Sequence, residues 1–402
     1  MLKKNNFFGN YFTNSKKYRK NVNKTKKVFK SFLSDFNNNE IPFLESFDKE
    51  YEFTFLPSTV KKFSKYKNII IIGMGGSILG AKGIYSFLKK KINKKVFFFD
   101  NLDANLNLKY KNIKNLNNSC FVIISKSGNT IETITNLGII FSKKLLRNKM
   151  VIITQSSNSE LIAFANRYNA EIIEHREYIG GRYSVLSEAG MFPAALMGLN
   201  LKKFKNFKFL IKNKNFIDSL IQNVASIYTL KQMNFDNSVI LNYDSNLNNI
   251  GYWYQQLTAE SLGKQRNGIT PMLSFCPKDH HSLLQLYIDG PKNKFFTFFN
   301  AKSKKDKYKI SRGIISKNSN FLANKSMNLV INAQSKATKR VFKLKKIPFR
   351  EITFNKIDEE ELGMIFSFFV LETILLSRLM NVNPFDQPAV EEVKVEAKKL
   401  LR

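Results

Sequence analysis

Short apolar runs that end in glycine or serine constrain the fold of this chain most. The first run, at 68–73, contains four consecutive isoleucines and passes through glycines into a helical pattern from Ser77 to about 90. Further apolar runs lie at 96–100, 120–125, 150–155 and 170–175, with helical patterns at about 130–146, 159–168 and 186–198. Continuous apolar strands separated by helices are typical of a parallel sheet that is covered on both faces. The sequence therefore predicts a doubly wound α/β unit.

A second alternation follows a stretch at 201–215 that is rich in Lys, Asn and Phe. Its apolar runs, taken as strands, lie at 238–243, 295–300 and 326–333, and a helical pattern covers about 249–262. Two α/β halves are expected on this pattern, with a boundary between about 200 and 235.

Helices near 16–35 and 358–380, and a short helix from Ala389, are expected to complete the chain. The predicted organisation is a helical arm at 1–45, a first α/β domain at 46–200, a second at 201–380 and a tail at 381–402. A length of 402 residues is consistent with two packed domains.

The formal charge of +34 comes from 65 Lys and Arg against 31 Asp and Glu. Most of the basic residues are lysines spread along the whole length beside many Asn and Ile, as drift in an A/T-rich genome would produce. No helix-turn-helix pattern or zinc-finger spacing is present, so a nucleic-acid partner is not expected. A positive field would nevertheless attract phosphate esters.

Membrane, secretion and metal signals are also missing from the sequence. The N-terminus has no apolar run of signal-peptide length, and no stretch approaches about 18 uninterrupted apolar residues. Cys120 and Cys276 lie far apart without metal or redox spacing, which favours buried thiols. We expect a cytoplasmic protein with no membrane partner and no bound metal.

Two loops between a strand and a helix carry the first chemical signal. Gly73-Met74-Gly75-Gly76-Ser77 lets the backbone approach an anion at a helix start, although a tight turn alone would explain it equally well. It has neither a dinucleotide fingerprint nor a P-loop lysine, so NAD and ATP are not expected.

The second loop is Ser125-Lys126-Ser127-Gly128-Asn129-Thr130. Three hydroxyls and the free N–H groups of a first helical turn can surround a phosphate dianion, whereas the simpler alternative is an ordinary helix cap. Because ligands of open α/β sheets bind at the carboxyl ends of strands, we expect both loops to form one sugar-phosphate site.

The Ser-x-Ser-Gly-x-Thr loop is similar to that of sugar isomerase domains, and the Gly-x-Gly-Gly-Ser loop resembles the first signature of phosphoglucose isomerases. Four more motifs continue the resemblance in order, so that it covers 73–394: they begin at Gly180-Gly181-Arg182, Gln255-Gln256-Leu257, Asp279-His280-His281 and Asn383-Pro384-Phe385. The resemblance implies two flavodoxin-like sugar isomerase domains, no cofactor, and interconversion of glucose 6-phosphate and fructose 6-phosphate. It also implies a homodimer with the active site near the subunit interface.

The resemblance assigns four catalytic roles. Glu260 would move the proton between C1 and C2, His281 would open the sugar ring, Lys394 would assist that opening, and Arg182 would stabilise the negative charge of the enediolate. His280, the neighbour of His281, receives no role. The expected substrate-binding residues are Gly76, Ser77, Ser125, Lys126, Ser127, Thr130, Gln256 and Gln387.

Two other functions compete with this assignment. Another sugar-phosphate isomerase built on the same domains would share the Ser127 loop but would not need Glu260, His281 and Lys394 in these surroundings. A phosphosugar-binding regulator would have no use for a catalytic base. The substrate expected here is a phosphorylated hexose.

Overall fold

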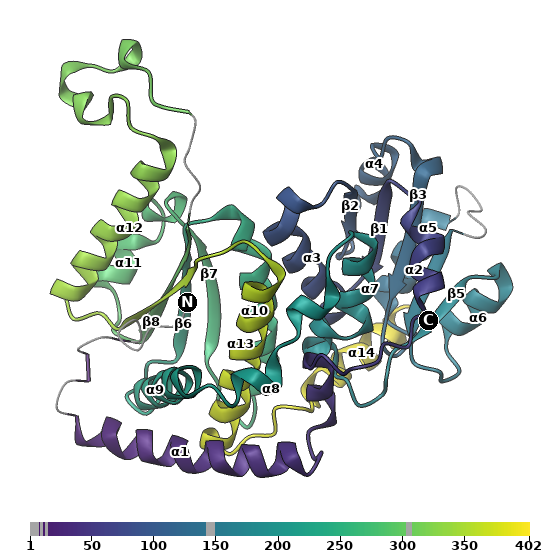
Figure 1. The fold of residues 1–402 in the computed structure, drawn as a ribbon, viewed down its shortest axis with the longest axis horizontal. Helices are drawn as coiled ribbons and strands as arrows, with labels where there is room; N and C mark the ends of the chain where they lie inside the picture. The colour runs from purple at the N-terminus through teal and green to yellow at the C-terminus, as the bar shows by residue number, and fades with distance from the viewer. Residues whose placement is uncertain (1–7, 9–10, 13–14, 142–148, 303–307) are drawn as a thin grey trace.

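The computed structural model describes residues 8, 11–12, 15–141, 149–302 and 308–402 and contains two separate parallel sheets (Figure 1). In the first half, the strand order is β2-β1-β3-β4-β5. Its strands are β1 Asn68–Gly73, β2 Lys95–Phe99, β3 Ser119–Ile124, β4 Met150–Thr154 and β5 Glu171–Glu174, so the five predicted strands are confirmed.

Helices cover both faces of this sheet. Successive isoleucines of β1 point to opposite sides, so both faces carry apolar side chains that must be buried. Ile69 and Ile71 belong to the main core, whereas Ile70 and Ile72 pack in a second cluster with Leu137 and other apolar residues. The helices of this half are α2 Pro57–Ser64, α3 Gly76–Leu88, α4 Leu106–Lys111, α5 Ile131–Phe141, α6 Glu160–Tyr168 and α7 Glu188–Leu196. The end of the helix predicted at 130–146 lies outside the described residues.

The second sheet has the order β7-β6-β8-β9, and all its pairs are parallel. Its strands are β6 Asn237–Asn242, β7 Thr270–Phe275, β8 Lys294–Ala301 and β9 Phe349–Phe354. The surrounding helices are α8 Phe207–Leu210, α9 Lys214–Lys231, α10 Asn248–Leu262, α11 Leu284–Asp289, α12 Met327–Leu344 and α13 Glu359–Met380. Two doubly wound halves with helical extensions are therefore confirmed, while the boundaries of the four predicted segments stay a prediction.

The strand predicted at 326–333 is wrong: these residues begin helix α12. Ser326 caps this helix by accepting a hydrogen bond from the N–H of Leu329 at 3.3 Å, and Leu329 is 50% exposed. Strands β7 and β9, which are the edge strands of the sheet, were not predicted from the sequence. Their burial alternates or is incomplete, so neither forms the continuous apolar run that marks a central strand.

Helix α1, Lys16–Asn37, lies along the second half and packs on α9 and α13 (Figure 1). Helix α13 is long and apolar enough to cross a membrane, but 89% of its apolar window is buried. That burial is typical of a core helix.

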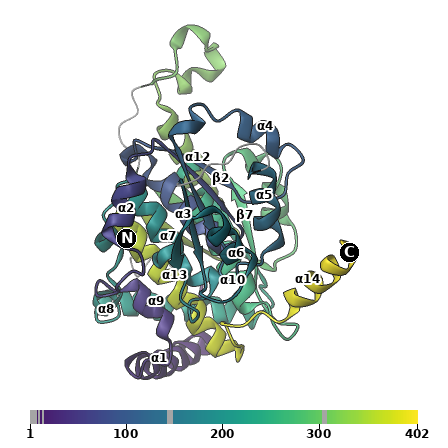
Figure 2. The same cartoon turned by 90° about the vertical axis from the view of Figure 1, so that its right-hand side faces the viewer.

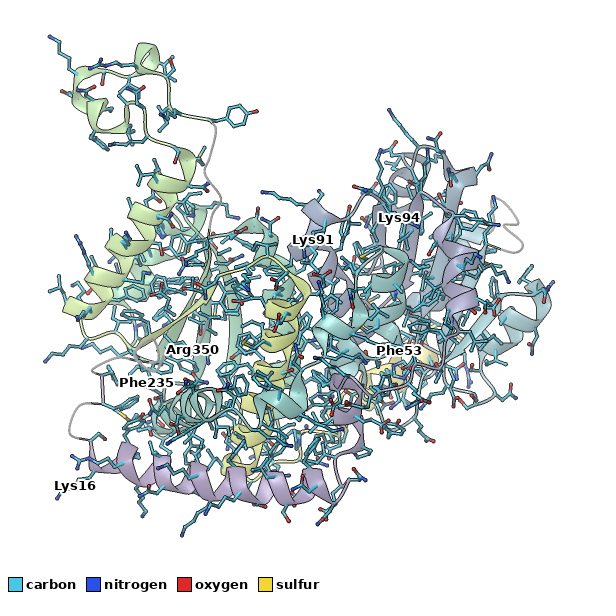
Figure 3. The ribbon with its side chains drawn as sticks, in the orientation of Figure 1. Lys16, Phe53, Lys91, Lys94, Phe235 and Arg350 are labelled. Carbon is cyan, nitrogen blue, oxygen red and sulfur yellow. The ribbon has the colours of Figure 1, made fainter. Side chains whose placement is uncertain are left out.

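A charged group lies inside this core, near the label Arg350 in Figure 3. Arg350 of β9 forms an ion pair with Glu372 of α13, and both side chains are buried. Arg350 also donates to Asn223 at 2.8 Å and to Thr297 at 2.8 Å. The group ties α9, β8, β9 and α13 together.

Helix α14, Ala389–Leu400, stands away from the body of the molecule (Figure 2). Nearly all of its residues are exposed, including Val393 at 71% and Leu400 at 87%.

Candidate active site

The two phosphate-binding candidates lie side by side at the carboxyl ends of two neighbouring strands in the first sheet. β1 and β3 are neighbours, and Gly73 at the end of β1 pairs with Ile124 at the end of β3. The chain leaves β1 towards β2 on one side and reaches β3 on the other, so this edge is a topological switch point. The predicted neighbourhood of the two loops is therefore confirmed.

The glycines of the first loop allow close approach of two other segments. Gly75 has φ +53°, and a Cβ atom there would lie 2.9 Å from Nε2 of Gln256. A Cβ atom on Gly76 would lie 2.2 Å from the carbonyl oxygen of Gly181. The bare backbone thus brings α10 and the segment around Gly181 to the edge of the first sheet.

The second loop is held in a defined shape before α5. Ser125 is buried, and its Oγ lies 2.9 Å from Oγ1 of Thr130. Gly128 has φ +66°, and a Cβ atom there would lie 2.2 Å from Oγ of Ser159. Ser127 is exposed, and its Oγ accepts the N–H of Asn129 at 3.3 Å. Hydroxyls and a helix start are available here for an anion.

Arg182 and Glu260 meet beside these loops. Arg182 lies in the 3₁₀ turn Gly181–Leu186, and Glu260 lies in the last turn of α10. Nη1 of Arg182 donates to Oε1 of Glu260 at 2.8 Å, and Nε2 of Gln256, one turn earlier on α10, donates to Oε2 at 2.9 Å. The side chain of Arg182 is 3% exposed and that of Glu260 is 21% exposed. The carboxylate is therefore fixed through both oxygens while one edge stays open to solvent.

Gln387 joins the same cluster from the C-terminal segment. Its Oε1 accepts a hydrogen bond from Nη1 of Arg182 at 2.8 Å. Nη2 of Arg182 donates to the carbonyl oxygens of Pro384 and Asp386, so one guanidinium organises the whole turn. Arg182, Glu260, Gln256 and Gln387, four of the predicted site residues, are thus brought together.

Lys264 is a cation of this site that was not predicted from the sequence. Its Nζ donates to the carbonyl oxygen of Asn383 at 2.6 Å and lies 3.2 Å from Oδ1 of Asp386. Burial lowers the pKa of Lys264, although Asp386 acts in the opposite direction. The available signal was its position just after α10, four residues beyond Glu260, where its Nζ reaches back to the carbonyl oxygen of Glu260 at 3.2 Å.

Two polar atoms of the cluster are buried without a hydrogen-bond partner in the described part of the chain. They are Nε of Arg182 and Oε1 of Gln256. Buried polar atoms are normally paired, so such atoms point to a ligand or water. Burial lowers the pKa of Lys126. The nearby carboxylate of Glu177 raises this pKa, and the positive charge of Arg182 has a smaller lowering effect.

His281 lies away from this cluster. Oη of Tyr243, just after β6, lies 2.8 Å from Nε2 of His280, which places both histidines at the carboxyl edge of the second sheet. Helix α10 begins at the same edge, because Asn242 donates to Oδ1 of Asn248 at 2.6 Å. Glu260 follows Asn248 by twelve residues, which corresponds to about 18 Å along a helix. One chain alone therefore keeps His281 and Glu260 at opposite ends of α10.

Lys394 is not brought to the cluster either. It lies on the projecting helix α14, where its Nζ forms an ion pair with Glu391 at 2.6 Å. Its side chain is 55% exposed.

No group of three or more His, Cys, Asp or Glu suited to a metal ion occurs in the described ranges. Cys120 is buried, which raises the pKa of its thiol to about 12, as burial also does for Cys276. Cys276 is only partly buried, so the expected burial holds fully for Cys120 alone.

Comparison with known proteins places this architecture in one family. The family model described as phosphoglucose isomerase matches residues 57–402. A glucose-6-phosphate isomerase from Methanocaldococcus jannaschii is 35% identical over 352 residues, which cover 85% of this chain and 86% of that protein. A probable glucose-6-phosphate isomerase from Methanococcus maripaludis is 31% identical over 399 residues, with 94% and 88% covered.

Solved structures share the fold at lower identity. A hypothetical protein from Thermus thermophilus superposes with a TM-score of 0.80 at 21% identity and covers 96% of both chains. A glucose-6-phosphate isomerase from Chlamydia trachomatis gives a TM-score of 0.70 at 19% identity, with 86% of this chain and 71% of that chain covered. The match of the family model over most of the length and the identities above 30% show that this chain belongs to the phosphoglucose isomerase family.

Proposed function

We propose that this protein interconverts glucose 6-phosphate and fructose 6-phosphate, as a cytoplasmic enzyme of glycolysis and gluconeogenesis. The observation that carries the proposal is a carboxylate, Glu260, held between Arg182 and Gln256 beside two loops suited to a phosphate. The names of the relatives at 31–35% identity support the same substrate pair.

The phosphate of the substrate would bind at the loop from Ser125 to Thr130 and near Ser77. Hydroxyls of Ser125, Ser127 and Thr130 and the start of α5 would donate to its oxygens, and Lys126 would add a positive charge. The opposite end of the open-chain sugar would then reach the Arg182 cluster, a few ångströms beyond the Gly76 loop.

Proton transfer would proceed through Glu260. Its free edge would take the proton from C2 of the aldose, the C–H electron pair would form the C1=C2 bond, and the π pair of the C1 carbonyl would move onto O1. The same carboxyl group would return its proton to C1 while the hydroxyl proton passes from O2 to O1, which leaves the C2 carbonyl of the ketose. Arg182 would stabilise the negative charge on the oxygens, which grows only in the transition state. Gln256 and Gln387 would hold sugar hydroxyls and fix the angle of approach.

We further propose that the working enzyme is a homodimer in which His281 is supplied by a second copy. Ring opening needs an acid–base group near neutral pH, and imidazole suits that role. Since His281 and Glu260 lie at opposite ends of α10 within one chain, a second copy is the direct way to complete the site. Lys394 would assist ring opening once α14 docks against a site, its own or that of the partner.

The activity is tested by incubating purified protein with fructose 6-phosphate and measuring glucose 6-phosphate in a coupled assay. We expect turnover without added metal or nucleotide. Folded protein without turnover would favour the regulator, and preference for an amino-sugar or pentose phosphate in the same assay would favour another isomerase. The proposal includes neither a nucleic-acid nor a membrane partner.

The shared site is tested by mixing two inactive variants, Glu260→Gln and His281→Ala, after unfolding and refolding them together. A hybrid dimer would contain one intact site, so the mixture should recover about a quarter of the wild-type activity if subunits pair at random. No recovery, with hybrids shown by mass spectrometry, would place His281 and Glu260 in the same chain or exclude His281 from catalysis.

A further inference from the structure

A second cavity lies at the carboxyl edge of the second sheet. Its volume is about 560 Å³, within the usual range of sites for small molecules. The segments that follow β6 and β8 line it, with the end of α3 and the first turns of α12 on the other sides. Figure 3 shows Lys91, one of the lining residues, between the two halves of the molecule.

The position of this cavity repeats that of the proposed active site. β6 and β8 are neighbours, and the chain leaves β6 towards β7 on one side and later returns to β8 on the other. This is the topological switch point of the second sheet, the place where open α/β sheets bind ligands. Tyr243 and Asp244 follow β6 here, as Met74 and Gly75 follow β1 in the first sheet.

The charges around the cavity favour an anion. Three lysines line it, namely Lys90, Lys91 and Lys302, against one carboxylate, Asp244. Lys91 is neutralised by Glu359 at 2.7 Å, whereas no ion pair of Lys90 or Lys302 is found among the described residues. Oδ1 of Asp244 accepts the backbone N–H of Asn246 at 2.9 Å and its side-chain amide at 2.8 Å, so this carboxylate serves to shape the loop.

The remaining lining combines apolar side chains with amide groups, as a binding site for a small polar metabolite requires. Phe87, Ile331 and Ile357 supply apolar surface, and Asn246 and Asn332 supply amide groups. Asn300 is positioned by its neighbours, since it donates to Glu351 at 3.2 Å and accepts from Ser335 at 3.2 Å.

We propose that this cavity binds a phosphorylated small metabolite of about hexose-phosphate size. The phosphate would lie between Lys90 and Lys302, and the amides would hold the hydroxyl-bearing part. Lysine ammonium groups would here take the place of the serine cradle of the first sheet.

Within one chain, the site is separate from the active site proposed around Glu260. Helix α3 begins at Gly76 beside Gly181 and ends at Leu88 in the cavity, a length of about 18 Å for twelve residue steps. Helix α10 packs against α3 in the opposite direction, since Gly83 faces Asn249 while Gly75 faces Gln256. Within one chain, ligands can therefore occupy both places at once, and the same two helices connect them.

Lysine footprinting of the whole protein tests the proposal. The protein is acetylated briefly with and without glucose 6-phosphate, and labelling of each lysine is measured by mass spectrometry. We expect protection of Lys90 and Lys302, no change at the exposed Lys292 on the amino edge of the same sheet, and separate protection of Lys126 in the active-site loop. Inorganic phosphate and glucose, used as separate probes, show whether the phosphate group or the sugar is recognised.

The variant Lys302→Ala should raise the glucose 6-phosphate concentration that protects Lys90 by roughly tenfold, the effect of one charge-assisted contact. Lys292→Ala is the matched control and should leave the protecting glucose 6-phosphate concentration unchanged. Unaltered labelling of Lys90 and Lys302 at up to about 10 mM ligand, well above common metabolite affinities, overturns the proposal. Protection of Lys126 reports on the active site independently, so failure of one site is distinguishable from failure of the other.

Discussion

Replacing Glu260 by Gln removes the proposed base with almost no change in shape. The new amide oxygen can still accept from Arg182, which also keeps the carbonyl oxygens of Pro384 and Asp386 as acceptors. The new amide nitrogen would face Nε2 of Gln256, but Gln256 can turn over, because its Oε1 is buried without a partner in the described structure. We therefore expect the variant to fold and to lose only about 1.5–3 kcal/mol of unfolding free energy, the range for a hydrogen bond to a charged group.

The catalytic loss should be much larger than the loss of stability. General base catalysis is typically worth 10²–10⁴ in rate, which corresponds to about 2.7–5.4 kcal/mol of transition-state stabilisation. The phosphate would bind at the Ser125–Thr130 loop, away from Glu260, so KM should change by less than about threefold. The expected result is a fall in kcat of roughly 10² or more with substrate affinity largely retained.

The measurement combines two assays on Glu260→Gln, the wild type and the control Glu360→Gln. Glu360 is exposed in the first turn of α13, so the control makes the same chemical change away from the site. The coupled assay gives kcat and KM, and NMR in D₂O follows exchange of the proton at C2. A Glu260→Gln enzyme within about threefold of the wild-type kcat, with C2 exchange intact, would show that the base lies elsewhere.

Three further variants test the site and the core. Lys394→Ala should lower kcat at least about tenfold if an ammonium group assists ring opening, whereas Lys398→Ala on the same helix should not; equal activity of the two in the coupled assay would remove Lys394 from the mechanism. Arg350→Met leaves the buried carboxylate of Glu372 unpaired and should cost about 3–5 kcal/mol in urea unfolding, while the double variant with Glu372→Leu should regain much of it; a double variant no more stable than the single one would contradict this. Burial lowers the pKa of Lys205 to about 7, so between pH 7 and its ordinary value near 10.5 the unfolded chain binds more protons than the folded one. Lys205→Met should therefore be most stabilising below pH 7, and its advantage over the wild type should shrink as the pH rises from 7 to 10.5; a constant difference in denaturant titrations would refute this.

The central strands and the two loops could be predicted because each depends on a short stretch of chain. β1 and β3 are buried on both faces and are therefore uniformly apolar, and the loops follow them directly. The edge strands β7 and β9 were not predicted because each has a neighbouring strand on one side only and is partly exposed. Their sequences are therefore not uniformly apolar. Residues 326–333 have apolar content that suits either a strand or a helix, and the cap at Ser326 together with solvent exposure along α12 decides for the helix.

The active-site residues also show the difference between what the sequence predicts and what the tertiary structure decides. The residue types needed for phosphate binding and proton transfer, and the order in which they follow the strands, are present in the sequence alone. Which of them meet depends on tertiary structure: Arg182 contacts Glu260, 78 positions away, and Gln387, 205 positions away, while His281 and Lys394 stay apart from them in one chain. Local patterns are set by neighbours along the chain, whereas such contacts arise only when α3, α10 and the C-terminal turn pack together, and packing depends on residues that the sequence keeps far apart.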